Sequence, residues 1–185
     1  MTMTGIKKNS RKKDQKKKLP VVVWLTGLSG AGKTTLAKHL VERFEEKEIP
    51  VEFLDGDIVR NIFPKTGFSR EERDRHIKRI GFLAGILERN GISVVASFIS
   101  PYKESRDFVR DNCSNFFEVY VATPLAECEK RDVKHLYARA RAGEIKHFTG
   151  IDDPYEEPEN PELKIDTTGR SVEECVDDII RELGI

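Results

Sequence analysis

Beyond Pro20, short apolar runs alternate along the chain with longer segments in which apolar residues recur at helical spacing. Five of the runs are rich in β-branched and aromatic residues, which is typical of β-strands. These runs are residues 21–25, 51–54, 92–98, 116–121 and 163–166. The first, third and fourth are almost wholly apolar, as expected where helices cover both faces of a parallel sheet.

The segments between the runs have the pattern of amphipathic helices. The apolar residues that recur in two of them are Leu36, Leu40 and Phe44, and then Ile77, Ile80, Leu83 and Leu87. Residues 69–72 and 171–174 both read Ser-x-x-Glu, the capping box that begins a helix. Strand–helix alternation repeated five times predicts an α/β fold, with a five-stranded parallel sheet and helices on both faces.

Residues 133–162 depart from this alternation. They are charged at first, then rich in Pro, Gly and acidic residues, and contain no strand-like run. We expect a helix followed by a long loop over the carboxyl edge of the sheet, and long ordered loops are usually functional.

The charge of the chain is divided unevenly. Of 185 residues, 32 are Lys or Arg and 32 are Asp or Glu, so the formal net charge is zero. Residues 1–18 hold eight of the basic residues and one acid, which leaves residues 19–185 with an excess of seven acids. We predict a disordered, solvated tail over 1–18 and one domain over 19–185. A basic tail could bind nucleic acid, but this one has no aromatic residue for base stacking, so we do not predict that role.

Several classes of protein are excluded by composition. No apolar run approaches the roughly 18 residues of a membrane span, and no apolar segment follows the basic N-terminus as in a secretory signal. Cys113, Cys128 and Cys175 fit neither a zinc site nor a disulfide framework, so we expect buried thiols and a cytoplasmic protein.

A phosphate-binding motif follows the first predicted strand. Residues 27–34 read GLSGAGKT, a full match to G-x-x-x-x-G-K-[ST], with a predicted helix directly after them. In this P-loop the backbone N–H groups surround phosphate, Lys33 reaches the β- and γ-phosphates, and Thr34 ligates Mg²⁺. The motif predicts a P-loop NTPase-type three-layer fold that binds a nucleoside triphosphate with Mg²⁺. The predicted nucleotide-binding residues are Gly27, Leu28, Ser29, Gly30, Ala31, Gly32, Lys33, Thr34 and Thr35.

Two carboxylates follow the second predicted strand. Asp55 and Asp57 are two residues apart, so on an extended segment both would point to one side, into the crevice beyond the strand. Such a pair could hold Mg²⁺ or accept a hydroxyl proton, or it could be a solvated Asp-Gly turn. No N/T-K-x-D guanine-reading motif occurs, which argues against a GTPase.

At this point the sequence closely resembles the adenylylsulfate kinase family, whose members phosphorylate the 3′-hydroxyl of adenosine 5′-phosphosulfate (APS). The matching stretches span residues 21–183: WLTGLSGAGKTT, DGDIVR, GFSREERDRHIKRIG, FISPYKESRD and RDVKHLYARARAGEIKHFTGIDDPYEEPENPEL. The resemblance implies catalytic roles for Lys33, Asp55, Asp57 and Ser100. It implies a metal site at Thr34 and Asp55, an ATP adenine contact at Arg131, and a lid over about 133–162.

The resemblance also implies an acceptor site. Its residues would be Asp57, Arg60, Phe68, Arg73, His76, Ile99, Ser100, Lys146 and Phe148. Arg60 and Arg73 would bind the phosphosulfate group, for which planar guanidinium groups are suited. Phe68 and Phe148 would sandwich the adenine, and because Phe148 lies in a polar loop we expect it to have little core to join.

The chain departs from the family pattern at a few positions. His76 stands where Asn is usual, Lys78 and Lys103 where Arg is common, and His147 where Asn or another polar residue is common. A histidine at position 76 would add titration near neutral pH. These departures are either neutral variation or a sign of altered substrate affinity.

These residues lead to one prediction and two alternatives. We predict a cytoplasmic APS kinase that makes 3′-phosphoadenylylsulfate from APS and ATP, with a homodimer expected from the resemblance. The alternatives are a related P-loop kinase acting on another nucleotide or a sugar hydroxyl, and a nucleotide-binding regulatory module that has lost turnover. Retention of the predicted P-loop, carboxylate and arginine residues argues against the last.

Overall fold

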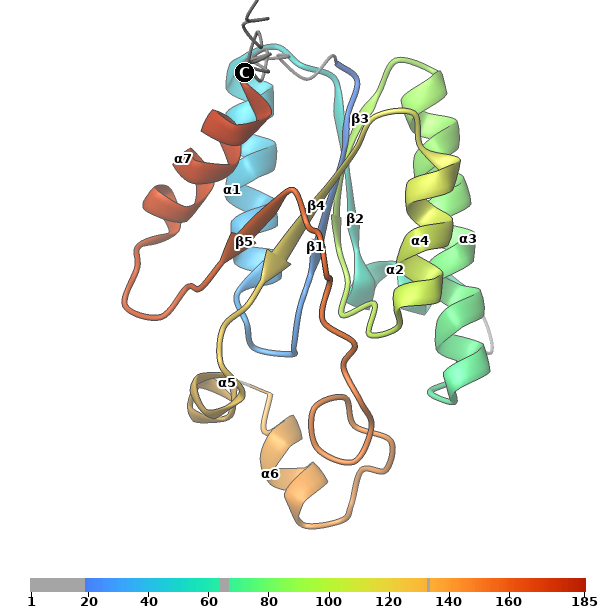
Figure 1. Cartoon of the computed structure of the whole chain (residues 1–185), viewed down its shortest axis with the longest axis vertical. Coiled ribbons are helices and arrows are strands. Elements are labelled where there is room, and N and C mark those ends of the chain that lie inside the picture. Colours follow the sequence, from blue (N-terminus) through green and yellow to red (C-terminus); the bar gives the residue numbers. More distant parts are fainter. Residues whose placement is uncertain (1–18, 64–66, 133) are drawn as a thin grey trace, which may run out of the picture.

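The computed structural model describes residues 19–63, 67–132 and 134–185. The predicted basic tail, residues 1–18, lies outside the described residues. The domain that follows it is a three-layer α/β structure, drawn in Figure 1.

All five predicted strands are present and form one parallel sheet in the order β2-β3-β1-β4-β5. The strands are β1 (Val22–Thr26), β2 (Val51–Asp55), β3 (Ser93–Ser97), β4 (Phe116–Val121) and β5 (Leu163–Ile165). The prediction of a five-stranded parallel sheet is therefore confirmed. Because β1 is central, the loop that follows it opens at the middle of the carboxyl edge, where ligands bind in open α/β sheets.

The helices cover both faces of the sheet, as predicted. In Figure 1 α1 (Lys33–Glu46) and α7 (Val172–Leu183) lie on one side, and α3 (Arg70–Arg89) and α4 (Lys103–Asn112) lie on the other. The shorter helices α2 (Gly56–Ile62), α5 (Leu125–Arg131) and α6 (Leu136–Arg141) lie toward the carboxyl ends of the strands. In the described parts of the chain, no helix is both long and apolar enough to cross a membrane.

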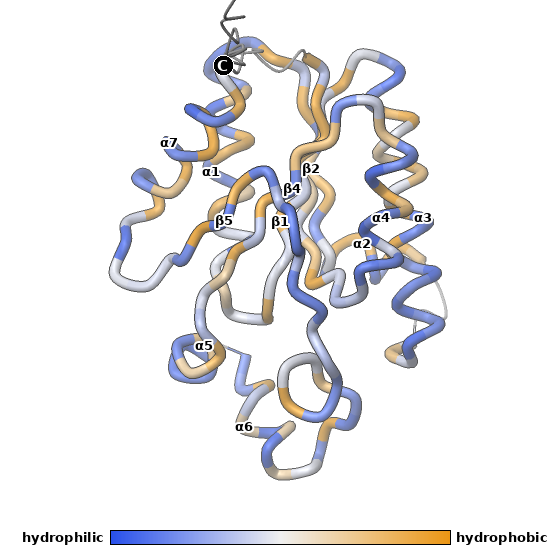
Figure 2. Tube along the Cα trace, in the orientation of Figure 1, coloured by the Kyte–Doolittle hydropathy of each residue, from blue (hydrophilic) through white to orange (hydrophobic). Residues whose placement is uncertain are grey.

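Alternation along β1 divides the core into two halves. Val23 and Leu25 pack with the buried residues of α1 and α7, whereas Val22 and Trp24 pack with those of α3. Every residue of β1 is buried, and Figure 2 shows hydrophobic residues concentrated along the strands. The almost wholly apolar composition of this run therefore follows from its burial on both faces.

Both predicted capping boxes are confirmed. Ser69 and Ser171 each accept a hydrogen bond from the backbone N–H of the glutamate three residues on, and Glu72 and Glu174 accept one in return from the serine N–H. The sequence pattern thus fixes where α3 and α7 begin.

The three cysteines are free thiols. Cys128 and Cys175 are buried, as expected, and Cys113 is half-buried. Burial raises the pKa of the Cys113 thiol to about 12, so the thiol is protonated at neutral pH.

A buried carboxylate joins the end of α3 to the beginning of β4. Glu88 is 4% exposed, and its two oxygens accept hydrogen bonds from the backbone N–H groups of Ser114 (2.8 Å) and Asn115 (2.6 Å). Since this turn connects α4 to β4, Glu88 ties the layer of α3 and α4 to the sheet.

We predict that Glu88→Ala lowers the free energy of unfolding by about 2 kcal/mol, because it leaves backbone donors without their acceptor. Urea denaturation of the variant and of Glu45→Ala, which removes an exposed carboxylate from α1, measures the effect. Equal midpoints for the two variants would contradict this role for Glu88.

Candidate functional site

The P-loop begins where β1 ends and passes directly into α1. Gly27 approaches β4 so closely that a Cβ there would lie 2.4 Å from the carbonyl oxygen of Val121, and its φ of 148° suits glycine. Gly32, with φ 101°, is the N-cap of α1, and Lys33 is the first helical residue. The N–H groups of the first turn of α1 therefore face the loop, which is the arrangement that binds phosphate.

Lys33 lies inside the loop. Its side chain is buried, and Nζ donates a hydrogen bond to the Leu28 carbonyl oxygen at 2.8 Å. Burial lowers the pKa of Lys33 to about 8, although the negative charges of Asp57 and Asp55 act to raise it. The lysine is thus placed where a phosphate held by the loop would be within its reach.

Asp55 orients the polar groups at the end of β2. One oxygen, Oδ1, accepts from the backbone N–H groups of Asp57 (3.0 Å) and Ile58 (3.3 Å), which makes Asp55 the N-cap of α2. The other, Oδ2, accepts from the Thr34 hydroxyl at 3.1 Å, and that hydroxyl lies 3.2 Å from Ser97 Oγ. Mg²⁺ prefers oxygen ligands and usually binds only one or two groups of the protein, so this cluster of oxygen atoms suits that ion.

The predicted geometry of the two aspartates is wrong. β2 ends at Asp55 and α2 begins at Gly56, so Asp57 lies in a first helical turn and the alternation of an extended strand does not apply. Asp55 is buried, whereas the Asp57 side chain is 74% exposed. The two carboxylates therefore have different surroundings and are suited to different tasks.

Lys134, which our sequence analysis did not single out, pairs with Asp57. Its ammonium group donates to Asp57 Oδ2, and it also acts electrostatically on Lys33. The lysine lies two residues before α6, in the segment predicted as a lid (about 133–162), which we call the lid from here on. It therefore brings a positive charge from the lid to the P-loop. Lys134 lies in the stretch RDVK that matches the family, and this match could have identified it. The surrounding segment is rich in charged residues, so nothing else in the sequence distinguishes this lysine.

The hydroxyl group of Thr26, the last residue of β1, joins three segments. It donates to the Ile99 carbonyl oxygen at 2.8 Å, accepts from Ser100 Oγ at 2.9 Å, and lies 3.0 Å from the Tyr155 hydroxyl. Ser100 also accepts from Trp24 Nε1 at 3.1 Å and is 1% exposed. The Ser100 hydroxyl is therefore fully engaged within the protein interior.

Arg106 on α4 fixes the same region from the other side. Its buried guanidinium donates to the carbonyl oxygens of Ser100 (2.7 Å) and Glu156 (2.6 Å) and pairs with Glu118 on β4 at 3.1 Å. Burial raises the pKa of Glu118, against the attraction of Arg106 and Arg110. Arg106 thus holds the end of the lid segment against the loop that carries Ser100. Its burial could not be predicted from the sequence, because the neighbouring residues are charged and typical of an exposed helix.

Arg60, Phe68 and Arg73 come together beside α2 and the beginning of α3. The Arg60 guanidinium donates to the Gly67 carbonyl oxygen at 2.8 Å and lies 4.5 Å from the centre of the Phe68 ring. Arg73 lies 5.9 Å from the same ring, and Phe68 is 59% exposed. The arrangement combines two cations with an accessible aromatic face.

Arg73 is also attached to the lid. Nη1 donates to Thr149 Oγ1 at 2.6 Å and lies 3.4 Å from Asp153 Oδ2, while Nη2 donates to the His147 carbonyl oxygen. The lid segment that contains the predicted residues Lys146 and Phe148 is therefore fastened to α3, and Lys146 is exposed on it.

Phe148 has a core to join, contrary to our expectation. It is half-buried, packs against the core half shared by α1 and α7, and meets the Tyr137 ring edge-on with centroids 5.0 Å apart. Tyr137 in turn donates from its hydroxyl to the Ser29 carbonyl oxygen at 2.8 Å. The lid thus folds onto the P-loop through aromatic packing that a polar local sequence conceals.

His76 differs from our expectation in its titration. It is 2% exposed, its ring lies edge-on to Phe63 and Phe98, and neither ring nitrogen has a hydrogen-bond partner among the described residues. Burial, together with the positive charges of Arg60 and Arg79, lowers its pKa to about 4. The ring is therefore neutral near pH 7 and adds no titration there.

Arg131 lies on the side of the P-loop near β5. Its guanidinium donates to the hydroxyl (2.8 Å) and carbonyl (3.3 Å) oxygens of Thr167 and to Glu127 at 3.2 Å. Thr167 donates to the Ala31 carbonyl oxygen at 3.1 Å. This contact sets Arg131 next to the P-loop, on the side away from α2.

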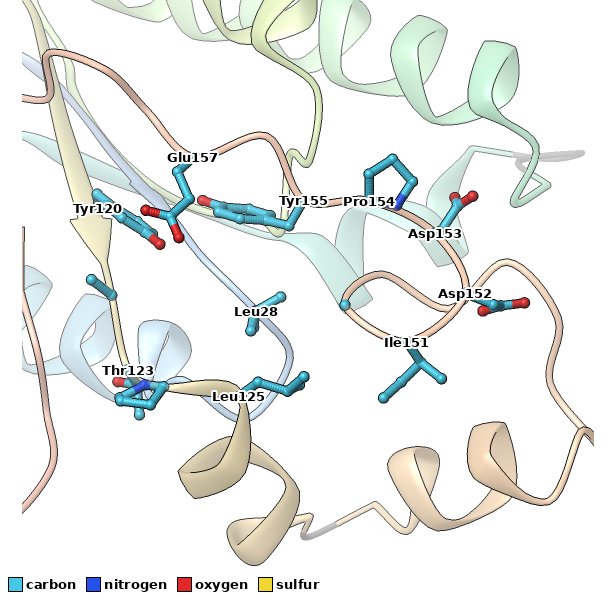
Figure 3. Close-up of a pocket in the computed structure, with 13 residues that line it drawn as sticks. Leu28, Tyr120, Thr123, Leu125, Ile151, Asp152, Asp153, Pro154, Tyr155 and Glu157 are labelled. Atoms are coloured by element: carbon cyan, nitrogen blue, oxygen red, sulfur yellow. The ribbon is translucent and has the colours of Figure 1, made fainter.

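A pocket of about 530 Å³ lies between the P-loop, the end of β4 and the lid. Figure 3 shows Leu28 at its centre, with Tyr155 and Glu157 on the lid side. Among the described residues, Leu28 is the one predicted site residue in its lining. The predicted acceptor residues therefore lie elsewhere around the P-loop.

Comparisons with known proteins agree with these observations. A protein-family model described as "Adenylylsulphate kinase" matches residues 19–166. The adenylyl-sulfate kinases of Gloeothece citriformis and Rippkaea orientalis are 54% and 56% identical over 164 residues, which cover 88% of this chain and 93% and 91% of those proteins.

Solved structures show the same similarity. The Mycobacterium tuberculosis APS kinase in complex with AMPPNP and APS superposes with a TM-score of 0.84 at 43% identity, covering 89% of this chain and 97% of that one. A hexameric APS kinase from Thiobacillus denitrificans has a TM-score of 0.68 at 38% identity, covering 89% of this chain and 28% of that one. A Janibacter sugar kinase at 16% identity and TM-score 0.60 shares the fold alone.

The buried, neutral His76 leads to a prediction about stability and pH. Because its pKa is lowered from 6.5 to about 4 in the folded state, the unfolded chain binds more protons between these values, so stability falls as the pH falls below 6.5. We expect this histidine to account for about 2 to 3 kcal/mol of that loss by pH 4. Urea denaturation of His76→Asn from pH 7 to 4 should show a flatter profile than the wild type. A profile that flattens equally in His39→Asn would contradict the assignment.

Proposed function

Because the chain belongs to the adenylylsulfate kinase family, we propose that it transfers the γ-phosphoryl group of ATP to the 3′-hydroxyl of APS, giving 3′-phosphoadenylylsulfate and ADP. One observation carries the proposal: a complete P-loop lies at the same edge of the sheet as the cluster of Arg60, Phe68 and Arg73. The P-loop suits a nucleoside triphosphate, and the cluster suits an anionic, aromatic acceptor.

The donor side is formed by the P-loop and Arg131. Backbone N–H groups of residues 28–32 and the ammonium group of Lys33 would hold the β- and γ-phosphates of ATP. Arg131, fixed by Thr167 and Glu127, would lie over the adenine. Placement of these groups before the reaction lowers the cost of stabilising charge in the transition state.

Thr34 Oγ1 and Asp55 Oδ2 are the groups that would hold Mg²⁺. They lie 3.1 Å apart, and the Asp55 carboxylate is held in place by its hydrogen bonds to the start of α2. The oxygen donors fit this ion, which when bound neutralises phosphate charge.

The acceptor side is formed by α2, α3 and the lid. Arg60 and Arg73 would bind the phosphosulfate group, and Phe68 and Phe148 would hold the adenine. Ile99, His76 and Lys146 are proposed as further contacts from the resemblance. Lys134, through its pair with Asp57, would bring a second lysine to the transferring group.

Transfer would be direct. The 3′-oxygen attacks the γ-phosphorus, its proton passes to the Asp57 carboxylate, and the bond from the γ-phosphorus to the bridging oxygen breaks to release ADP. Because the Ser100 hydroxyl is buried and hydrogen-bonded to Trp24 and Thr26, we assign it a structural role and no phosphoserine intermediate.

The remaining expectations stay predictions. The homodimer is expected from the resemblance and the cytoplasmic location from composition, whereas one relative, the APS kinase from Thiobacillus denitrificans, is hexameric. A related kinase with another acceptor remains the second candidate, since His76 replaces the usual Asn. Coupled ADP release with APS tests the proposed activity.

We predict that Lys33→Ala lowers turnover by more than about a hundredfold, a barrier increase of about 2.7 kcal/mol, because the transferring charge loses its cation. Coupled ADP release measures it. The control is Lys38→Ala, an exposed lysine on α1, which should turn over like the wild type. Turnover of Lys33→Ala within tenfold of the wild type would contradict the role.

We also predict that Phe148 has two separable contributions. Phe148→Ala should lower both the melting temperature and APS affinity, because the ring packs on Tyr137. Phe148→Leu keeps much of the packing but loses base stacking, so its APS affinity should fall by roughly 5- to 150-fold, from about 1–3 kcal/mol per stacked base, with little change in melting temperature. Calorimetric titration with APS and ATP, and a melting curve, measure both. Unchanged APS affinity in the leucine variant would defeat the stacking role.

A further inference from the structure

The Arg73 side chain binds a turn of the lid, residues 147–153. Three groups hold its guanidinium: the Thr149 hydroxyl at 2.6 Å, the Asp153 carboxylate at 3.4 Å, and the His147 carbonyl oxygen. We call these three groups the Arg73 socket. The Arg73 side chain is only 11% exposed, so the socket covers most of it.

The turn that forms the socket has internal hydrogen bonds that do not involve Arg73. The Asp152 carboxylate accepts from the backbone N–H groups of His147 (2.7 Å) and Phe148 (2.6 Å), and hydrogen bonds to these groups lower its pKa. Gly150 N–H donates to the Asp153 carbonyl oxygen at 2.8 Å. The three groups of the socket are therefore positioned partly by contacts within the lid itself.

The negative charge of the socket is also fixed. Asp153 Oδ2, the oxygen nearest Arg73, accepts from the Tyr102 hydroxyl at 3.1 Å. The other oxygen lies 3.9 Å from His147 Nδ1, and the Asp153 side chain is 18% exposed. These contacts hold the Asp153 carboxylate beside the Arg73 guanidinium.

The same guanidinium has two prospective anionic partners. Arg73 is proposed above to bind the phosphosulfate group, and in this structure it already pairs with a carboxylate. Two anions close to one guanidinium repel each other, and a partly buried carboxylate is weakly screened by salt. An anionic acceptor must therefore bind against the charge of Asp153.

We propose that Asp153 sets the affinity of the acceptor subsite by competing internally with the anionic acceptor for Arg73. The inference rests on the proposed function, because it takes Arg73 as part of that subsite. Asp153 is an affinity-determining residue that acts through Arg73 and through the attachment of the lid to α3. Its effect falls on acceptor binding and spares binding of ATP.

Asp153→Asn is the direct test, since it removes the charge and keeps the shape. We expect the Kd for APS, measured by calorimetry, to fall by about 3- to 10-fold. The KM for ATP should stay within about twofold of the wild type, and the melting temperature within about 2 °C. The matched control is Glu144→Gln, which removes an exposed lid carboxylate paired with Arg139 at 3.1 Å. The control should leave the Kd for APS within twofold.

A double-mutant cycle with Arg73→Ala identifies the route of the effect. The change caused by Asp153→Asn should vanish when Arg73 is absent. A Kd for APS that falls less than threefold or rises in Asp153→Asn overturns the inference, as does an equal fall in Glu144→Gln or an effect that persists without Arg73. A wild type that does not phosphorylate APS would overturn the proposed function, whereas wild-type APS affinity in Arg73→Ala would overturn the inference alone.

Discussion

The hydroxyl group of Thr26, buried at the end of the central strand, is the contact on which the arrangement of the site depends. Within about 3 Å it meets the Ile99 carbonyl oxygen, the Ser100 hydroxyl and the Tyr155 hydroxyl. It thereby joins the strand that leads into the P-loop, the loop after β3 and the segment that ends the lid. A hydroxyl can donate one hydrogen bond and accept others, so one small side chain can set the distances among three segments far apart in the sequence.

The sequence predicted the fold well because the fold depends on local patterns. Burial of β1 on both faces requires an apolar run, and a helix start requires a capping box, so both can be read directly. The P-loop was equally readable, since a loop that surrounds phosphate requires glycines and a lysine at fixed spacing. Geometry that depends on tertiary contacts was harder to predict. The start of α2 at Gly56 separated Asp55 from Asp57, and Tyr137 gave Phe148 a partner from another part of the lid.

Several charged residues of the site have partners within the chain. Lys33 meets the Leu28 carbonyl oxygen, Asp57 meets Lys134, and Arg73 meets its socket on the lid. No local pattern predicts the pairs of Asp57 and Arg73, because their partners lie 77 and 76 positions away in the sequence. When a substrate binds to these residues, their contacts within the chain must be replaced by contacts with the substrate. The free energy of substrate binding is therefore the difference between the two sets of contacts.

The central claim is that this site phosphorylates an acceptor carrying both an adenine ring and an additional anion. The most direct measurement compares the initial rates of ADP release with APS, adenosine 5′-monophosphate, other nucleotides and sugars as acceptors. We expect kcat/KM for APS to exceed that for adenosine 5′-monophosphate by more than about a hundredfold, or about 2.7 kcal/mol. The reason is that Arg60 and Arg73 are proposed to bind the phosphosulfate group, and the monophosphate lacks its sulfate. Absence of turnover with APS, or an equal kcat/KM for another acceptor, would contradict the account.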